Sequence, residues 1–339
     1  ISLLRDDWST KDIDCACEGL ESLLPPQEQG IYDILVKKNE KAAIVRVDGS
    51  VQDEYDYRVL AEFDGVQFKI KLYRNELNID GIPQAFFKRD FFLKAPFRAK
   101  DFKKNPIEIV ETISSLLNTT SEDQIKTVER IGHFVFDVRF LKLTDSEKEF
   151  CKGFHKAIPI NRKRWMEQFA GIRIYRDNFS VRPYGDQTSN SFDWLGLDAR
   201  KNLNPVAVSH KSLQWHVRHS QVQGALFISR VDNPGIADKS SREGLIENAQ
   251  FNNLCSVLRA LISVFERDRA QIEREIRAYG EEVDETERVK RDAAEYARAE
   301  LSGQSQNKDD GAETGSGDRE KQKIYAKAIK YFREEIDEL

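Results

Sequence analysis

The fold class follows from one stretch of the sequence, Tyr57-Arg-Val-Leu-Ala-Glu-Phe-Asp-Gly-Val-Gln-Phe-Lys-Ile-Lys-Leu-Tyr73. Asp64-Gly65 is a turn signal between its two halves, so the stretch predicts a hairpin of two antiparallel strands. From Val66 to Tyr73, apolar and polar side chains alternate, as a strand requires when one face of its sheet packs on a core and the other is wet. The stretch therefore predicts an antiparallel sheet and argues against a doubly wound one.

Strands and helices are mixed along the remainder of the chain. Apolar residues recur at helical spacing over 106–117, and large apolar residues alternate over 131–143 as in a strand. A second hairpin is predicted at 172–175 and 179–182, turned by Arg176-Asp177-Asn178. Together these patterns predict an α+β fold with mixed or antiparallel sheets and packed helices. Further strands are predicted over 31–36, 42–47 and 224–231, and further helices over 9–24, 145–155 and 162–169.

A long charged helix is predicted to begin after Ser240. Its apolar stripe has spacings of three and four and continues into a highly charged stretch that reaches about Leu301, which is typical of a coiled coil. We therefore expect a coiled-coil arm that joins two copies of the chain in a homodimer, although the arm can instead fold back on its own domain. The stripe consists of Leu254, Leu258, Leu261, Phe265, Ile272, Ile276 and Tyr279.

Composition and charge exclude several classes of protein. Hydrophobic residues make up 40% and charged residues 33% of the 339 residues, which is typical of a folded globular protein. The net charge is −5, from 53 basic and 58 acidic residues, so there is no global basic field of the kind that general nucleic-acid binders carry. No apolar run reaches the length of a membrane span, and no secretory signal is present. We expect a cytoplasmic protein without a membrane partner.

The cysteines predict neither disulfides nor a metal centre. Cys15, Cys17, Cys151 and Cys255 are too few and too scattered for a disulfide framework, so they are interpreted as reduced thiols. Cys15 and Cys17 have no second pair to complete a zinc set. Cys255 lies in an apolar helical run and is expected in the core.

The candidate phosphate site lies between Val231 and Asn248. Ser240 and Glu243 stand three residues apart and predict a capping box at a helix start. Arg242 would then lie in the first turn, beside unpaired backbone N–H groups, where a phosphate is well accommodated. Lys239, just outside the predicted helix, can join it. The alternative is a solvated loop followed by an ordinary helix cap.

A second candidate is a basic segment that carries an aromatic residue. Lys211 and Arg218 can contact nucleic-acid phosphates, and Trp215 can stack on a base. The alternative is a solvated loop. The histidines of the same segment, His210, His216 and His219, do not have the spacing of a zinc site, so no metal is expected there.

Several motifs together resemble one family. They are Gly171-Ile-Arg-Ile-Tyr-Arg-Asp-Asn-Phe-Ser-Val-Arg-Pro183, Trp194-Leu-Gly-Leu-Asp198, Asp232-Asn-Pro-Gly235 and Ser241-Arg-Glu-Gly-Leu-Ile-Glu-Asn248. They resemble the second half of the GHKL ATPases, which include DNA gyrase B, the ninety-kilodalton heat-shock chaperone, histidine kinases and MutL. The MORC-like and bacterial defence-associated members look most similar. Leu3-Leu-Arg-Asp-Asp-Trp8 is similar to the last strand of the ATP-binding domain in that family.

The resemblance implies a transducer domain, which inserts a basic residue into the nucleotide site of a neighbouring ATP-binding domain. In the chaperone branch this residue is the arginine of a Ser-Arg-Glu motif, which matches Arg242; in the gyrase and MutL branches it is a lysine, for which Lys239 is the candidate. Ser241 and Asn233 are the expected nucleotide contacts beside them. The family's asparagine and glutamate for magnesium and water, and its glycine-rich loops, are not found in this sequence.

The missing motifs predict that ATP and Mg²⁺ act only in a longer protein with an N-terminal ATP-binding domain, and that this chain alone is inactive. The pathway and the client stay open, and the partner is expected to be DNA or another protein. The alternative function is a non-catalytic scaffold or nucleic-acid-binding module. The expected segments are 1–30, the end of the ATP-binding domain; 31–145, a β-rich subdomain; 146–250, a transducer-like subdomain; 251–301, the coiled coil; 302–320, a linker; and 321–339, an amphipathic helix.

Overall fold

The computed structural model describes residues 54–144, 153–187, 191–240 and 244–303, together with 9, 12, 20, 34–37, 44–46 and 189. The chain divides into two compact units, Ile1–Arg274 and Glu275–Leu339, and each is described by itself. Within the described residues we find no helix with the length and apolar character that crossing a bilayer demands. Of the linker predicted at 302–320, residues 302 and 303 belong to the long helix Ala249–Gly303, and the remainder lies outside the described residues, as does the helix predicted at 321–339.

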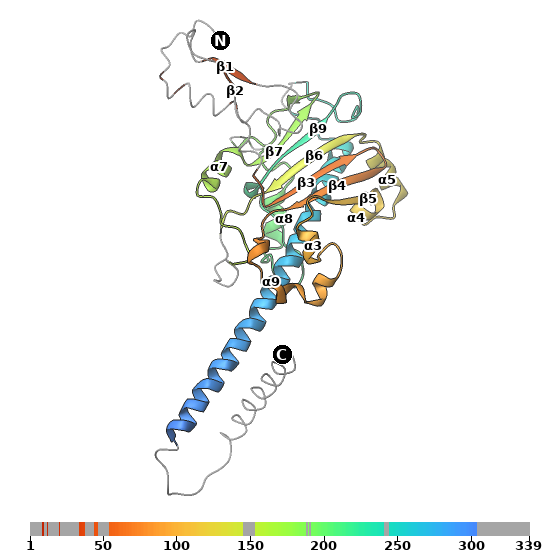
Figure 1. The fold of residues 1–339 in the computed structure, drawn as a ribbon. Coiled ribbons are helices and arrows are strands. Elements are labelled where there is room, and N and C mark those ends of the chain that lie inside the picture. The colour runs from red at the N-terminus through yellow and green to blue at the C-terminus, as the bar shows by residue number, and fades with distance from the viewer. Residues whose placement is uncertain are drawn as a thin grey trace. The chain divides into compact units, whose positions relative to one another are not determined.

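The centre of the first unit is a mixed seven-stranded sheet (Figure 1). The hairpin predicted from 57–73 is confirmed, with Phe63 paired to Phe68 beside the turn. All neighbouring strands are antiparallel except β7 and β9, which are parallel. The strand order is β5 (Ile107–Thr112), β4 (Gln67–Arg74), β3 (Tyr57–Phe63), β6 (Phe134–Phe140), β9 (Val222–Ile228), β7 (Gly171–Arg176) and β8 (Phe179–Ser180).

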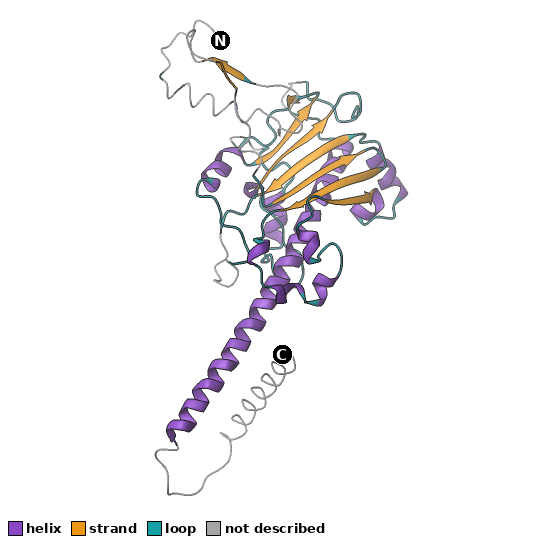
Figure 2. Cartoon of the chain, in the orientation of Figure 1, coloured by secondary structure: helices purple, strands orange, loops and turns teal. Residues whose placement is uncertain are grey.

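Short helices and one long helix accompany the sheet (Figure 2). A separate two-stranded sheet pairs β1 (Leu35–Lys37) with β2 (Ile44–Arg46); β1 overlaps the strand predicted over 31–36, and β2 lies within the strand predicted over 42–47. The α+β class is thus confirmed. The helices are α2 (Gln84–Phe87), α3 (Ala99–Phe102), α4 (Ile113–Leu117), α5 (Glu122–Glu129), α7 (Arg162–Phe169), α8 (Leu197–Leu203) and α9 (Ala249–Gly303), with 3-10 turns η3 (Ile79–Gly81), η4 (Asp90–Leu93) and η5 (His219–Gln221).

The predicted helix over 106–117 is wrong in its first half. Residues 107–112 form the edge strand β5, and only 113–117 are helical. Ile107 and Ile109 pack against the core from one face of the strand, so the two-residue alternation outweighs the helical spacing. The Thr112 hydroxyl then accepts a hydrogen bond from the backbone N–H of Ser115 and begins α4. Most of the helix predicted over 145–155 lies outside the described residues.

The predicted division between 31–145 and 146–250 does not separate two bodies. Strand β6 from the first segment pairs directly with β9 from the second, and Val138 lies opposite Gly224. Side chains from both segments also belong to one hydrophobic core. A single sheet therefore joins the two predicted subdomains.

The first half of α9 packs on one face of this sheet. Leu254, Leu258 and Leu261 are fully buried in the sheet's own core. The ring of Phe265 lies 5.7 Å from that of Phe140 and 6.1 Å from that of Tyr57, measured between ring centroids. The part of the apolar stripe that was interpreted as a coiled-coil seam is therefore core up to Phe265. The spacing of apolar residues alone does not distinguish a coiled-coil seam from a face that is buried in the core of the same chain.

A buried group of charges holds the same helix against the sheet edge. Arg269 donates two hydrogen bonds of 2.6 Å to the carboxylate of Glu76. Its guanidinium carbon also lies 4.8 Å from the ring centroids of both Phe140 and Trp215. The adjacent Asp268 accepts a 2.8 Å hydrogen bond from Arg74. Buried charges of this kind are tolerated because each finds a partner of opposite sign.

Replacing Arg269 by Met should lower the free energy of unfolding by about 3–5 kcal/mol, because Glu76 would lose its main partner while remaining buried. Urea denaturation followed by circular dichroism measures the change. Arg267 lies on the same helix but is exposed, so Arg267→Met should change the free energy by less than about 0.5 kcal/mol. Equal losses in the two variants would contradict a special role for the buried arginine.

Candidate functional site

The predicted phosphate site lies on a small hairpin that connects β9 to α9. Asp238 and Leu245 form an isolated antiparallel bridge. The backbone N–H of Lys239 donates to the carbonyl of Gly244 at 2.9 Å, and that of Ile246 donates to the carbonyl of Ala237 at 2.8 Å. These bonds close a loop over 237–246, called the 237–246 loop below. Ser241, Arg242 and Glu243, which belong to this stretch of sequence, lie outside the described residues.

The expected helix start at Ser240 is wrong, because α9 begins at Ala249. The cap is Asn248, whose side-chain oxygen accepts a hydrogen bond from the backbone N–H of Phe251 at 2.9 Å. The argument that places Arg242 in a first helical turn therefore does not apply. A basic residue of this loop would bind a phosphate through its own charge and the length of its side chain, without a contribution from a helix dipole.

The base of the 237–246 loop is anchored to the sheet. The buried Arg176, at the end of β7, bonds to Asp238 at 2.7 Å and also donates to the carbonyl of Ile236. From the other side, the Tyr184 hydroxyl accepts a 3.0 Å hydrogen bond from the backbone N–H of Leu245. Ile236 and Leu245 are themselves buried in the core. The two ends of the loop are thus held in place by side chains from distant parts of the chain.

Lys239 is exposed at one side of this loop. Its Nζ atom lies 3.5 Å from a carboxylate oxygen of Glu247, and the two side chains are 43% and 68% exposed. An exposed pair at this distance contributes little to stability. The ammonium group is therefore available to an anion that approaches the loop.

Asn233 has a structural role and not the expected nucleotide contact. It is fully buried, and its amide nitrogen donates to the carbonyls of Ile131 and His133 at 2.7 and 2.9 Å. Its oxygen accepts a 2.8 Å hydrogen bond from the backbone N–H of Ser229. A tight approach of the chain at Gly132, with φ +81°, accompanies these bonds, since a Cβ atom there would lie 1.9 Å from the carbonyl oxygen of Asp232.

The basic aromatic segment does not form the expected stacking surface. Trp215 is buried, with its ring edge-on to Phe140 and Arg269 over its face. A base cannot stack on a ring that is already covered on this side by core residues. Lys211 and Arg218 are exposed and keep only the ability to contact phosphates.

The three histidines of that segment turn to separate partners. His216 and His219 lie 3.0 and 2.7 Å from Glu266 and Asp198, respectively, and His210 bonds to Ser212 at 2.9 Å. They do not form one ligand set. Cys255 is buried, as predicted, and burial raises the pKa of its thiol to about 11, which keeps it protonated and unreactive.

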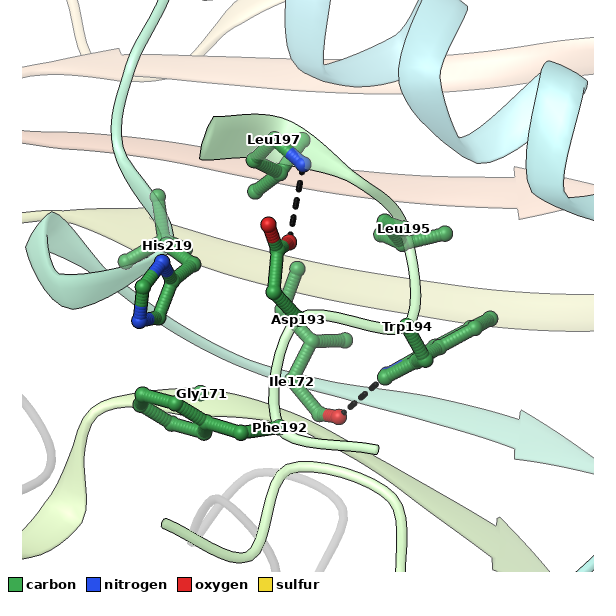
Figure 3. Close-up of a pocket in the computed structure, with 9 residues that line it drawn as sticks. Gly171, Ile172, Phe192, Asp193, Trp194, Leu195, Leu197 and His219 are labelled. Carbon is green, nitrogen blue, oxygen red and sulfur yellow. Dashed lines mark hydrogen bonds between the residues drawn. The ribbon is translucent and has the colours of Figure 1, made fainter. Parts of the chain in front are cut away.

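Asp193, Asp198 and His219 form a group of carboxylate and imidazole side chains that the sequence did not predict. Asp193 and His219 line a small pocket beside α8 (Figure 3). Both oxygens of Asp193 accept hydrogen bonds, at 2.8 and 2.9 Å, from the backbone N–H groups that begin α8, and Asp198 pairs with His219. These bonds explain the group as a helix cap and a charge pair. The pocket encloses about 180 Å³ and is lined by Gly171, Ile172, Phe192, Asp193, Trp194, Leu195, Leu197, His219 and Val222.

A second group with metal-ligand chemistry, Glu76, His155 and Glu273, lies in the buried charge network. Nε2 of His155 is 2.6 Å from a carboxylate oxygen of Glu273 and 3.8 Å from one of Glu76. Arg269 and Lys142 also face these carboxylates, at 2.6 and 3.9 Å from Glu76. The cations already present balance the two acidic groups, so the arrangement is that of an ion network.

His155 should make the stability of the protein depend on pH. Burial by itself would lower the pKa of His155 and Lys142 opposes its protonation, but the hydrogen bond and charge of Glu273 and the charge of Glu76 raise the pKa above its ordinary value of about 6.5. The folded protein thus holds this proton more tightly than the unfolded chain does. The resulting stabilisation is complete below about pH 6.5 and is lost as the pH rises through the raised pKa.

The free energy of unfolding should accordingly fall over that pH interval in the wild type, and His155→Gln should remove this part of the dependence. Denaturant titrations at a series of pH values measure both curves. A difference between wild type and variant that stays constant with pH would contradict the assignment.

Comparison of the chain with protein-family models, with curated proteins and with solved structures found no match. The similarity to GHKL ATPases therefore rests on the sequence motifs alone, chiefly 171–183 and 231–248. The function has to be argued from the residues and contacts of this chain.

Proposed function

We propose that the chain is the transducer and dimerisation region of a GHKL-type ATPase, which brings a basic residue of the 237–246 loop to the γ-phosphate of ATP. The observation that carries this proposal is the anchoring of the loop: its base is held by Arg176 and Tyr184, while Lys239 is exposed. A cation on a loop with a fixed base can be positioned at low entropic cost when a partner domain closes on it.

Charge at the transferred phosphoryl group explains why a cation is needed. Negative charge spreads over its oxygens in the transition state, and a preorganised cation in a site that excludes water stabilises it. Lys239 has only a weak exposed pair with Glu247 to give up on entering such a site. Arg242 is the second candidate from the motif. ATP and Mg²⁺ would be bound by an N-terminal ATP-binding domain of a longer protein, with Ser241 beside the phosphates.

The loop also offers a mechanical route to α9. Leu245 is fully buried, and Asn248 caps the helix that begins at Ala249. A displacement of the loop on domain closure would therefore pass along four residues of chain into the helix. We propose that α9 relays nucleotide-driven closure to DNA or to another protein in this way.

The test is ATP turnover by the full product of the gene. Lys239→Ala or Arg242→Ala should reduce kcat by roughly 10²-fold or more with KM largely kept, because the cation acts mainly on the transition state. Lys211→Ala is a matched control, since Lys211 is also exposed but is not part of the loop. Its turnover should be unchanged.

Wild-type turnover that neither loop variant alters would remove both residues from the mechanism. A full gene product that does not hydrolyse ATP would favour the alternative, a non-catalytic scaffold or nucleic-acid-binding module. Lys211 and Arg218 would then be the residues to test for phosphate contacts.

We further propose that the second half of α9 mediates self-association. In the second unit, Tyr279, Val283 and Thr286 are half-buried at spacings of four and three, among exposed residues such as Glu282 and Glu285. This is the narrow stripe that a two-stranded coiled coil uses.

Changing Tyr279 and Val283 together to Glu should shift the protein from dimer to monomer, because like charges would face each other in the seam. Sedimentation equilibrium over a range of concentrations measures the mass. The control replaces the exposed Glu282 and Glu285 by Gln and should leave the mass unchanged. A seam variant that keeps the wild-type mass would show that this stripe is not the dimer contact.

A further inference from the structure

The face of the sheet opposite α9 carries polar side chains that are nevertheless buried. Asp137 and Arg139 of β6 and Gln223 of β9 are each less than 5% exposed. They point away from the apolar core because they alternate with the core residues of their strands. The central strands β6, β9 and β7 lie side by side at this place (Figure 1).

The register of these strands forms a hollow between two rows of side chains. In one row, Asp137 lies opposite Ala225, which lies opposite Arg173. In the next row, Arg139 lies opposite Gln223. Because Ala225 is small, the long side chains around it border a small pocket. Its lining consists of Asp137, Arg139, Arg173, Tyr175, Gln223 and the strand around Ala225.

Gln223 faces this pocket without a partner. Its side chain is buried, and its Oε1 atom accepts no hydrogen bond from any residue that the structure describes. A buried amide atom left unsatisfied in this way costs about 1–3 kcal/mol in general, so such groups are rare unless a ligand or water meets them. Since the two ends of an amide are interchangeable by rotation, the group can offer either an acceptor or a donor to a bound molecule.

The arginine on the other side of the hollow is also incompletely matched. Arg173 makes one long hydrogen bond of 3.5 Å, to the carbonyl of Phe169; burial lowers its pKa, and the charges of Tyr175 and Asp186 only partly oppose that shift. Asp137, the carboxylate in the lining, is engaged elsewhere: both of its oxygens accept hydrogen bonds from Arg58, and one accepts a further bond from Arg139. The guanidinium of Arg173 is thus the donor that the pocket can present to an anion.

We propose that this pocket binds a small oxyanion, a phosphate or carboxylate group, between Arg173 and Gln223. A guanidinium matches two oxygens of such a group at once, and the amide supplies a further hydrogen bond. The inference does not depend on the ATPase proposal, because the pocket shares no residue with the 237–246 loop.

Isothermal titration calorimetry of the intact chain with inorganic phosphate tests the site, with sodium chloride holding the ionic strength constant. A parallel titration with acetate distinguishes a phosphate site from a carboxylate site. Arg173→Gln should weaken the binding at least about tenfold, the expected loss of a charge-assisted pair. The control Arg267→Gln makes the same change of charge at an exposed position and should bind like the wild type.

Gln223→Met provides a second, independent variant. It removes the unsatisfied amide but keeps the length of the side chain, so it should weaken anion binding without lowering the melting temperature in anion-free buffer. This variant decides the question if Arg173→Gln does not fold. Absence of binding of both anions to the wild type, or equal binding by the wild type and the folded pocket variants, would overturn the proposal.

Discussion

The guanidinium of Arg269 lies between the rings of Phe140 and Trp215 and forms two hydrogen bonds with Glu76, and the position of α9 depends on this contact. A charge buried there is costly unless every part of its surroundings is in place. The contact therefore stabilises one rotation and one depth of the helix against the sheet. Nonspecific apolar packing by Leu254 or Leu261 alone would allow several rotations and depths of the helix.

The sheet then separates two environments. Its apolar face packs on α9, whereas its other face buries the paired charges of Arg58, Asp137 and Arg139 and leaves the pocket beside Gln223. The link between sheet and helix is the 237–246 loop. It leaves the sheet after β9, is anchored by Arg176, and enters α9 at Asn248. A displacement of the loop would therefore act directly on α9, a helix whose position against the sheet is fixed.

Local patterns predicted the elements whose stability is local. The hairpin of β3 and β4 and helix α7 follow from turn chemistry and periodicity within a few residues. The start of α9 was wrong because a capping box at Ser240 is a local signal, and it competes with Arg176 and Tyr184, which hold the loop from distant parts of the chain. The prediction that Trp215 stacks on a base was wrong for the same reason, because the composition of a basic segment does not reveal whether its aromatic side chain is exposed.

By itself, the sequence determined the α+β class, the two hairpins and the buried thiol of Cys255, because alternation, turn residues and composition act over short distances. Only the tertiary structure decided that 31–145 and 146–250 share one sheet, that Asn233 and Trp215 are buried, and that Arg173 and Gln223 border one hollow. These facts depend on strand register and on pairs of residues far apart in the chain, which no local pattern encodes.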